Sequence, residues 1–233
     1  MTNNIVNNLK EINGIISEAC KKSNRQENDI TIVAVTKYTD ALGIENCINA
    51  GLCNIGENKA QQAIPKIEKL ISYNKINWHF IGHLQTNKVK YVLPYFSVIH
   101  SLDRISLAKE INIQANKLNK NIDCLIQVNV ANEETKFGVQ PERLFDLAKE
   151  ISQFNNIKIT GLMTMAPYVS NAEDTRHIFS ELRAMKEELA SLDLPNFTLQ
   201  HLSMGMSNDY AIAIEEGATI IRLGRVLLSD NTN

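Results

Sequence analysis

The chain has 233 residues, of which 44% are hydrophobic and 21% are charged. This length exceeds that of a usual single domain but suits one α/β barrel, and the composition supports a large buried core. Because 24 Lys and Arg residues are set against 26 Asp and Glu residues, with no strongly basic or acidic block, neither nucleic acid nor a membrane surface is expected as a partner.

The sequence shows no targeting signal and no metal-binding pattern. Polar Asn and Glu side chains interrupt the first twenty residues, and no later apolar run reaches the length of a membrane span, so a cytoplasmic location is expected. The four cysteines are scattered, without a Cys-x-x-Cys pair or a histidine at metal-ligand spacing. We interpret them as reduced, mostly buried thiols and expect no metal site.

The first two predicted elements are a helix and a buried strand. Residues 3–23 should form an amphipathic helix, because apolar residues recur at steps of three and four: Ile5, Leu9, Ile12, Ile16 and Ala19. Residues 30–37 form a run of Ile, Val and Thr that ends in Lys37; since this run has no polar alternation, both of its faces should be covered. Lys37 would then lie at the carboxyl end of a strand, where α/β sheets and barrels bind ligands. On this strand alone, a lysine that reaches out to water is the more ordinary interpretation.

Further strands follow, and each but the last is succeeded by a helical pattern. The predicted strands cover residues 52–55, 78–83, 97–101, 121–130, 157–165, 196–204 and 218–222. Asp40 and Asp103 are predicted to cap helix N-termini, and Gly51 is predicted to end a helix in the left-handed conformation. Pro141 suits the first position of a helix.

Eight strand and helix units in a chain of this length predict a single (β/α)8 TIM barrel with an extra N-terminal helix, forming one domain over residues 1–233. A doubly wound open sheet is the alternative, since periodicity does not show whether a sheet closes. In both folds the residues after the strands gather at one end of the sheet: Lys37, Asn58, His83, Ser101, Asn129, Met163, Ser203 and Arg222.

The last two units carry a pattern typical of phosphate sites. Residues 203–207 read Ser-Met-Gly-Met-Ser, and residues 222–225 read Arg-Leu-Gly-Arg. Glycines let backbone N–H groups approach an anion, and a hydroxyl at a helix N-terminus adds a donor where the helix favours negative charge. Barrels commonly bind phosphate in the loops after strands seven and eight. Taken singly, Ser207 is also compatible with an ordinary N-cap and Gly224 with a turn glycine.

A lysine and a phosphate site at the same end of a barrel indicate a Schiff base with a phosphorylated aldehyde, because lysine is the side chain that forms imines. Pyridoxal phosphate carries both groups. Arg222 would meet its pyridine nitrogen: a guanidinium is always protonated, so it donates to that nitrogen and keeps the ring neutral, a poor electron sink. Alone, Arg222 is equally compatible with a salt-bridged arginine. A barrel enzyme that acts on sugar phosphates through a lysine imine fits Lys37 and the phosphate site on the same physical grounds.

Seven segments then carry a resemblance to a known family. They are AVTK (34–37), GENKAQ (56–61), HFIGHLQTNK (79–88), HSLD (100–103), GLMTMAP (161–167), LSMGMSND (202–209) and IRLG (221–224). In this order they make the chain similar to the pyridoxal phosphate homeostasis protein family, also called the YggS/PROSC family. The similarity covers nearly the whole chain, so it is specific.

The resemblance implies a barrel of the alanine racemase N-terminal type that holds pyridoxal 5'-phosphate (PLP) as an aldimine on Lys37. Carried over position by position, it places Arg222 near the pyridine nitrogen, and Ser207, Gly224 and the backbone of Arg225 near the phosphate. It also implies that four further residues line the pocket: Asn58, His83, Met163 and Ser203.

Three positions depart from the family pattern. Lys59 stands where an aromatic residue is usual, and Gln62 replaces a common glutamate. Arg225 stands where many relatives have threonine, so a guanidinium contact to phosphate is expected in place of a hydroxyl contact. The departures bear on cofactor affinity and leave the assignment of Lys37 unchanged.

The function implied by the resemblance is intracellular PLP homeostasis and supply, with effects on amino acid and keto acid balance and without clear catalytic turnover. PLP-dependent apo-enzymes would receive the cofactor, and a monomer is the simplest state. The alternative is a PLP-dependent amino acid racemase, which needs an acid and a base on opposite faces of the substrate carbon. In alanine racemases the second group is a tyrosine from a C-terminal β-domain of the partner subunit, and this sequence shows no such domain. The glycine-rich segment that follows the racemase lysine is also replaced, by residues 38–40.

Weak racemase activity stays compatible with these observations, because Tyr168 lies in the loop after the sixth predicted strand. His79, on a buried strand, is interpreted as a hydrogen-bonded core histidine rather than a base. The methionines that end strands six and seven are interpreted as barrel packing.

Overall fold

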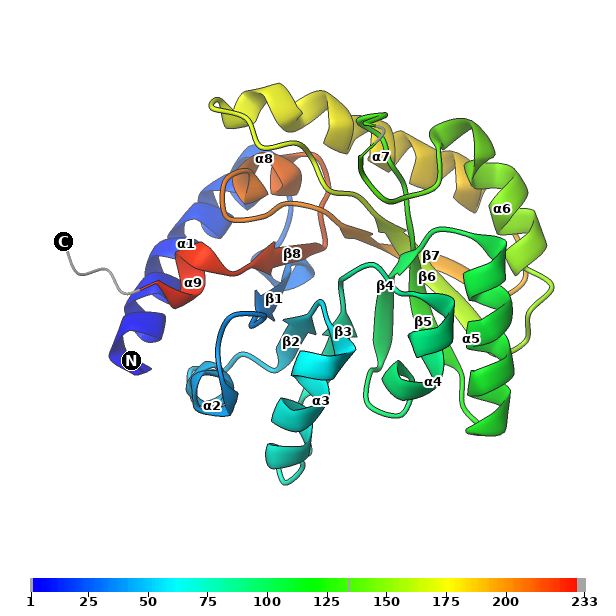
Figure 1. The fold of residues 1–233 in the computed structure, drawn as a ribbon. Coiled ribbons are helices and arrows are strands. Elements are labelled where there is room, and N and C mark those ends of the chain that lie inside the picture. Colours follow the sequence, from blue (N-terminus) through cyan, green and yellow to red (C-terminus); the bar gives the residue numbers. More distant parts are fainter. Residues whose placement is uncertain (1, 134, 230–233) are drawn as a thin grey trace.

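In a computed structural model that describes residues 2–133 and 135–229, eight parallel strands close into a barrel (Figure 1). Strands that are neighbours in sequence pair in order, and the last pairs with the first. This confirms the predicted barrel and rules out the doubly wound open sheet. The strands are β1 (Thr31–Val35), β2 (Asn54–Glu57), β3 (Asn77–Phe80), β4 (Val98–Leu102), β5 (Ile122–Gln127), β6 (Ile157–Met163), β7 (Phe197–Ser203) and β8 (Ile220–Leu223).

Helices surround the barrel. They are α1 (Thr2–Lys22), α2 (Ala41–Asn49), α3 (Ala60–Lys69), α4 (Val89–Val92), α5 (Ile105–Lys117), α6 (Leu144–Ile151), α7 (Arg176–Ala190), α8 (Tyr210–Glu215) and α9 (Arg225–Leu228). Short 3-10 turns precede β1, α4, α6 and α7: η1 (Glu27–Asp29), η2 (Thr86–Lys88), η3 (Pro141–Arg143) and η4 (Ala172–Thr175). Within the described ranges, no helix is both long and apolar enough to cross a membrane.

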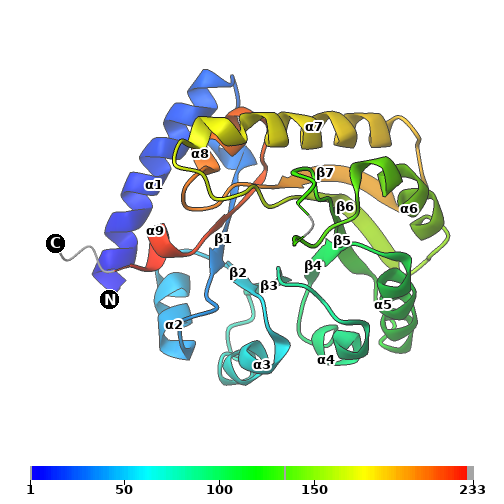
Figure 2. The ribbon, with the colours of Figure 1, turned by 45° about the horizontal axis from the view of Figure 1, so that its top comes forward.

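The N-terminal helix completes the ring of helices. α1 lies beside α8, α9 and α2 (Figures 1 and 2). Since α9 has only four residues, it is too short to cover this part of the barrel, and α1 does so with a buried stripe that includes Ile12 and Ile16. Asn8 Nδ2 donates to the carbonyl oxygens of Leu227 at 3.0 Å and Ser229 at 3.1 Å, which ties α1 to the end of α9.

Strand side chains alternate between the helices and the barrel interior. Outward residues such as Ala34 and Ile126 join the large core beneath the helices. A separate apolar cluster contains Val33 from β1 and Leu125 from β5. Because these strands lie on opposite sides of the barrel, this cluster is inside it. The other inward positions include polar side chains, which need hydrogen-bond partners within the barrel.

Local signals at helix ends are partly confirmed. The Asp40 side chain accepts the Gly43 N–H at 2.9 Å as the N-cap of α2, and Gly51 has a left-handed φ of +92°. The prediction for Asp103 is wrong, because Arg104 is the N-cap of α5. Asp103 Oδ1 accepts instead from the Arg104 guanidinium at 2.5 Å, a bond between two charged groups that engages this carboxylate away from the helix N-terminus.

All four cysteines have free thiols, three of them buried and Cys53 half-buried. Among the residues that the structure describes, no group of three or more His, Cys, Asp or Glu side chains is placed to hold a metal ion.

Gly161→Ala should destabilise the barrel strongly. A Cβ at this position in β6 would lie 2.0 Å from the backbone oxygen of His201 in β7. We expect the free energy of unfolding, measured by urea denaturation, to fall by about 3 kcal/mol or more. Gly14→Ala is the control: its Cβ would meet nothing within 4 Å on the exposed face of α1, and it should raise stability by about 0.5–1 kcal/mol. A Gly161→Ala protein as stable as the wild type would contradict this close approach of β6 and β7.

Candidate functional site

A cavity of about 950 Å³ opens at the carboxyl ends of the strands. Its position is the one at which barrels of this type bind their ligands. The structure brings most of the predicted site residues to its wall: Lys37, Asn58, His83, Ser207, Arg222, Gly224 and Arg225. The contact of each with a ligand stays a prediction.

Two predicted site residues lie outside the cavity lining. Met163 packs inside the barrel against the cluster of Val33 and Leu125, and Met165, two residues further along the chain, lines the cavity instead. Ser203 is fully buried, and its Oγ accepts from Arg222 Nη1 at 2.7 Å. These two side chains therefore support the wall of the cavity rather than form it.

Loops contribute lining residues that sequence reasoning missed. The loops after β1, β5 and β6 supply Tyr38, Phe137, Pro167, Tyr168 and Val169. Of these, Tyr168 is considered above as a loop residue compatible with weak racemase activity, and the structure places it in the cavity wall. The signal available was the position of aromatic residues shortly after predicted strands, which does not show whether a loop folds over the barrel or away from it.

A clamp of charged and backbone groups fixes the turn that carries Lys37. Lys66 Nζ donates to the carbonyl oxygens of Thr36 at 2.9 Å and Thr39 at 3.2 Å, and to Glu57 Oε1 at 2.5 Å. Thr36 Oγ1 donates to the same carboxylate oxygen at 2.6 Å. Because Glu57 is fully buried and Lys66 largely so, these bonds are shielded from water. The backbone on both sides of Lys37 is thereby held in place.

The Lys37 amine itself is free of competing partners. Its Nζ lies 4.9 Å from the centre of the Tyr38 ring, and within the described part of the chain no hydrogen bond or ion pair engages it. The side chain is half-buried and reaches the cavity. An amine with no carboxylate partner is available as a nucleophile once it loses its proton.

Arg222 brings a buried cation to the floor of the cavity. Its guanidinium donates from Nη1 to Ser203 Oγ and, at 2.8 Å, from Nη2 to the Thr164 carbonyl oxygen. Burial lowers the pKa of Arg222 to about 10, an effect that the charge of Asp209 opposes, so the group is protonated at neutral pH. A guanidinium has five N–H hydrogens, and no acceptor among the described residues engages the other three. They are available to a ligand atom that accepts a hydrogen bond.

The loops after β7 and β8 supply donors suited to an anion. Ser207 Oγ accepts the Val226 N–H at 3.4 Å, which leaves its own hydrogen to donate. Gly224 and Arg225 have backbone N–H groups without an acceptor among the described residues, and the Arg225 side chain is exposed and unpaired there. The alternative interpretation of Ser207 as an ordinary N-cap is wrong, because Asp209 occupies that position of α8.

Glycine is required in the first of these loops. Gly205 has a left-handed φ of +90°, and a Cβ there would lie 2.7 Å from the Ala213 side chain and 3.0 Å from Tyr210 Cα. The loop can therefore pack this closely on α8 only without a side chain at position 205.

The wall near β2 and β3 is polar but poorly paired. Asn58 Oδ1 and His83 Nδ1 are buried atoms without a hydrogen-bond partner among the described residues. His83 Nδ1 lies 3.6 Å from Asp103 Oδ2, beyond hydrogen-bond distance, and its ring stacks on Phe137 with centroids 3.8 Å apart. Burial lowers the pKa of His83 against the opposing charge of Asp103, so the ring is neutral at pH 7. Unpaired buried atoms of this kind mark a wall that a polar ligand can satisfy.

Beneath the cavity, a line of hydrogen bonds crosses the barrel interior. It joins Arg222 to Ser203, Ser203 Oγ to His100 Nδ1 at 2.9 Å, His100 Nε2 to His79 Nδ1 at 2.9 Å, and His79 Nε2 to Asn54 Oδ1 at 3.1 Å. Burial lowers the pKa of His79 to about 4 and that of His100 well below its ordinary value, so both rings are neutral. The interpretation of His79 as a hydrogen-bonded core histidine is confirmed.

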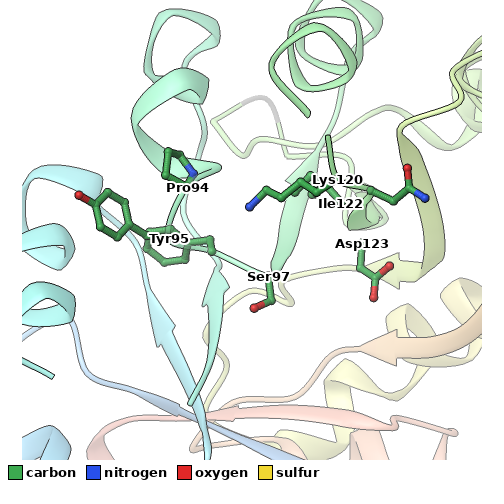
Figure 3. A pocket seen from close by; sticks show the side chains of 8 residues that line it. Pro94, Tyr95, Ser97, Lys120, Ile122 and Asp123 are labelled. Carbon is green, nitrogen blue, oxygen red and sulfur yellow. The ribbon is translucent and has the colours of Figure 1, made fainter. Parts of the chain in front are cut away.

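A second, smaller hollow of about 380 Å³ lies at the opposite, amino-terminal end of β4 and β5 (Figure 3). Its wall includes Tyr95, Ser97, Lys120 and Asp123. The Lys120 amine donates to the Leu93 carbonyl oxygen at the end of α4, so it serves the fold and is not free for a ligand. The chemistry-bearing residues therefore gather in the larger cavity.

Comparisons with known proteins agree on one family. Residues 15–232 match the model of the alanine racemase N-terminal domain. The chain is 46% identical to the pyridoxal phosphate homeostasis protein of Aquifex aeolicus, over 92% of this chain and 93% of the relative. It is 32% identical to the protein of the same name from Escherichia coli, over 97% of this chain and 96% of the relative.

Solved structures give the same result. PipY of Synechococcus elongatus, solved with PLP bound, is 32% identical to this chain with a TM-score of 0.81, and the match covers 92% of this chain and all of PipY. Alanine racemase of Clostridium difficile, at 15% identity and a TM-score of 0.78, matches 99% of this chain but only 60% of its own length. The racemase likeness shows a shared fold.

The stability of the protein should fall as the pH is lowered from about 6.5 to 4. His79 titrates near 6.5 in the unfolded chain and at about 4 in the fold, because burial disfavours its charged form. Above pH 6.5 neither state binds this proton. As the pH falls, the unfolded chain binds the proton first, which lowers the free energy of unfolding by roughly 3 kcal/mol at pH 4. Urea denaturation across this range measures the slope. His79→Gln should flatten the slope, whereas His177→Gln, at an exposed position, should leave it unchanged; equal slopes in all three proteins would contradict the assignment.

Proposed function

This chain belongs to the pyridoxal phosphate homeostasis protein family, and we propose that it holds PLP at the mouth of its barrel in the service of intracellular PLP homeostasis and supply, with effects on amino acid and keto acid balance. One observation carries the proposal: a free lysine amine, a buried arginine donor and a loop with unpaired backbone N–H donors share a single cavity. PLP offers an aldehyde, a pyridine nitrogen and a phosphate, and each has a chemically matched group there.

Lys37 is proposed to bind the cofactor covalently. The Lys37 amine would hold the cofactor through a C=N bond to the aldehyde carbon, and the aldehyde oxygen would leave as water. The clamp made by Lys66 and Glu57 supports this assignment, since it fixes the turn on both sides of Lys37 while leaving its amine unpaired.

The two ends of the ligand would be held by the arginines and the neighbouring loop. The Gly224 and Arg225 N–H groups, the Ser207 hydroxyl and the Arg225 guanidinium are proposed to bind the phosphate. Arg222 is proposed to donate to the pyridine nitrogen from one of its unused N–H groups.

In this proposal the remaining predicted residues line or support one side of the ligand. Asn58 and His83 would line one side, with Met163 and Ser203 as support from the barrel interior.

Carrier function without clear turnover is favoured over racemisation. An arginine donor leaves the ring nitrogen unprotonated, which makes the cofactor a weak electron sink. Tyr38 and Tyr168 line the cavity, but they are 92% and 77% exposed, and neither hydroxyl has a hydrogen-bond partner among the described residues. Neither is thus positioned as an acid or base opposite Lys37. The curated relatives are named as homeostasis proteins.

An enzyme that binds a sugar phosphate through a lysine imine is disfavoured for a different reason. Such enzymes need carboxylates near the lysine. Of the described residues that line the cavity, Asp209 is the one carboxylate, and its Oδ1 already accepts the Met206 N–H at 2.6 Å.

The proposal also covers the protein's domain organisation, location, oligomeric state and partners. It treats residues 1–233 as one PLP-binding domain acting as a cytoplasmic monomer, with PLP-dependent apo-enzymes as recipients. The free cysteines fit a reducing compartment.

Lys37→Ala should abolish covalent loading with PLP. Wild-type protein incubated with PLP is expected to show an imine absorption band, and borohydride should trap the cofactor on the peptide that contains Lys37, as read by mass spectrometry. Lys59→Ala is the control, since this lysine is exposed and lies outside the cavity lining. Undiminished trapping in Lys37→Ala, or racemisation of an amino acid at ordinary enzyme rates that depends on Lys37, would contradict the proposal.

Ser207→Ala and Arg225→Ala should each weaken PLP binding roughly tenfold, because each removes a bond to a charged group. Titration with pyridoxal, which lacks the phosphate, should give nearly the same affinity for both variants and the wild type. Arg143→Ala, at an exposed position near α6, should leave both affinities unchanged. A loss of affinity that is equal for PLP and pyridoxal would show that these residues do not bind the phosphate.

A further inference from the structure

The hydrogen bonds beneath the cavity can run in only one direction. Asn54 Oδ1 accepts from Asn77 Nδ2 at 3.2 Å and is a carbonyl oxygen, so His79 Nε2 must donate to it. A neutral His79 then has a lone pair on Nδ1, which requires His100 Nε2 to donate. A neutral His100 likewise has a lone pair on Nδ1, which requires the Ser203 hydroxyl to donate.

The Arg222 end of this line of hydrogen bonds fixes the same direction. Arg222 has donors only, so Ser203 Oγ accepts from it while its hydrogen points to His100. Every donor from Arg222 to Asn54 therefore points away from the guanidinium. Each group in the chain turns its negative end towards Arg222, and successive bonds polarise one another.

This arrangement stabilises a buried cation without a carboxylate. Arg222 is 4% exposed, and the ion pairs found among the described residues do not include it. Its protein acceptors are neutral oxygens, those of Ser203 and Thr164. Asp209 acts on this cation only through its charge, and because no carboxylate among the described residues accepts a hydrogen bond from the guanidinium, its remaining N–H groups stay available as donors towards the cavity.

We propose that His100 is a positioning residue for Arg222: with His79 and Asn54 behind it, it fixes the Ser203 hydroxyl so that the guanidinium faces the ring nitrogen of the bound cofactor and holds that nitrogen unprotonated. This inference rests on the proposed function, because it assumes that PLP occupies the cavity. His100 touches no ligand in this account and acts through Ser203 and Arg222. The histidines then serve the electronic state of the cofactor as well as the fold.

The direction of these hydrogen bonds can be tested without any cofactor. In protein labelled with ¹⁵N at histidine, the nitrogen chemical shifts at pH 7 should show that both His79 and His100 carry their hydrogen on Nε2 and none on Nδ1. His79→Gln and His100→Asn assign the signals. A hydrogen on Nδ1 of either ring would overturn the proposal.

The effect on the cofactor is tested in loaded protein, with PLP labelled by ¹⁵N at the ring. His100→Leu, which removes the acceptor for Ser203, should move the ring-nitrogen shift towards that of a protonated pyridine and speed PLP release roughly tenfold. His100→Asn retains an acceptor near the position of Nδ1 and should restore both values. Ser203→Ala should behave like His100→Leu and replaces it if that variant fails to fold. His201→Gln is the control, since His201 bonds to Thr219 and does not belong to the line of hydrogen bonds from Arg222 to Asn54.

The outcomes separate the two proposals. If wild-type protein forms no imine band with PLP, the proposed function fails, and with it the part of the inference that concerns the ring nitrogen. If wild type loads normally but His100→Leu and Ser203→Ala keep its ring-nitrogen shift and release rate, the proposed function stands and the positioning role of His100 is refuted.

Discussion

The need to keep a positive charge inside a barrel organises the centre of this protein. Arg222 on β8 lies almost entirely out of water, and no carboxylate among the described residues accepts a hydrogen bond from it. Leaving a buried cation without acceptors would cost several kcal/mol. The interior positions of β7, β4 and β3 meet this need with Ser203, His100 and His79, which explains why polar residues replace the usual aliphatic filling of a barrel.

Two lysines at the same end of the barrel illustrate how surroundings decide what one residue type does. Lys66 is surrounded by acceptors, namely the Glu57 carboxylate and two carbonyl oxygens, so its amine is saturated and its role is structural. Lys37 lies on the turn that Lys66 holds, and its amine is left unpaired among the described residues. Rigid backbone around a free amine is the combination that covalent binding of an aldehyde requires.

Sequence patterns predicted the eight strands, the N-terminal helix and the gathering of Lys37 and Arg222 at one end, because these depend on local periodicity and on which residues follow strands. They did not predict the Lys66 clamp, since Thr39 and Thr36 are 27 and 30 residues away and come close to Lys66 only when β1 and β2 pair. They also failed to separate Met163 from Met165. Met163 is the last residue of β6 and Met165 follows it, so the position at which the strand ends decides which of the two reaches the cavity.

The docking of α1 onto the last helix has a consequence for how the chain is made. α1 is synthesised before all eight strands, yet its neighbours α8 and α9 follow β7 and β8, and its partners Leu227 and Ser229 lie 219 and 221 residues after Asn8. Its apolar stripe therefore lacks these neighbours until α8 and α9 have been synthesised. Closure of the strand ring also waits for β8. The native barrel consequently forms only after β8 and α9 have been synthesised, and the exposed stripe of a shorter nascent chain is a natural target for chaperones.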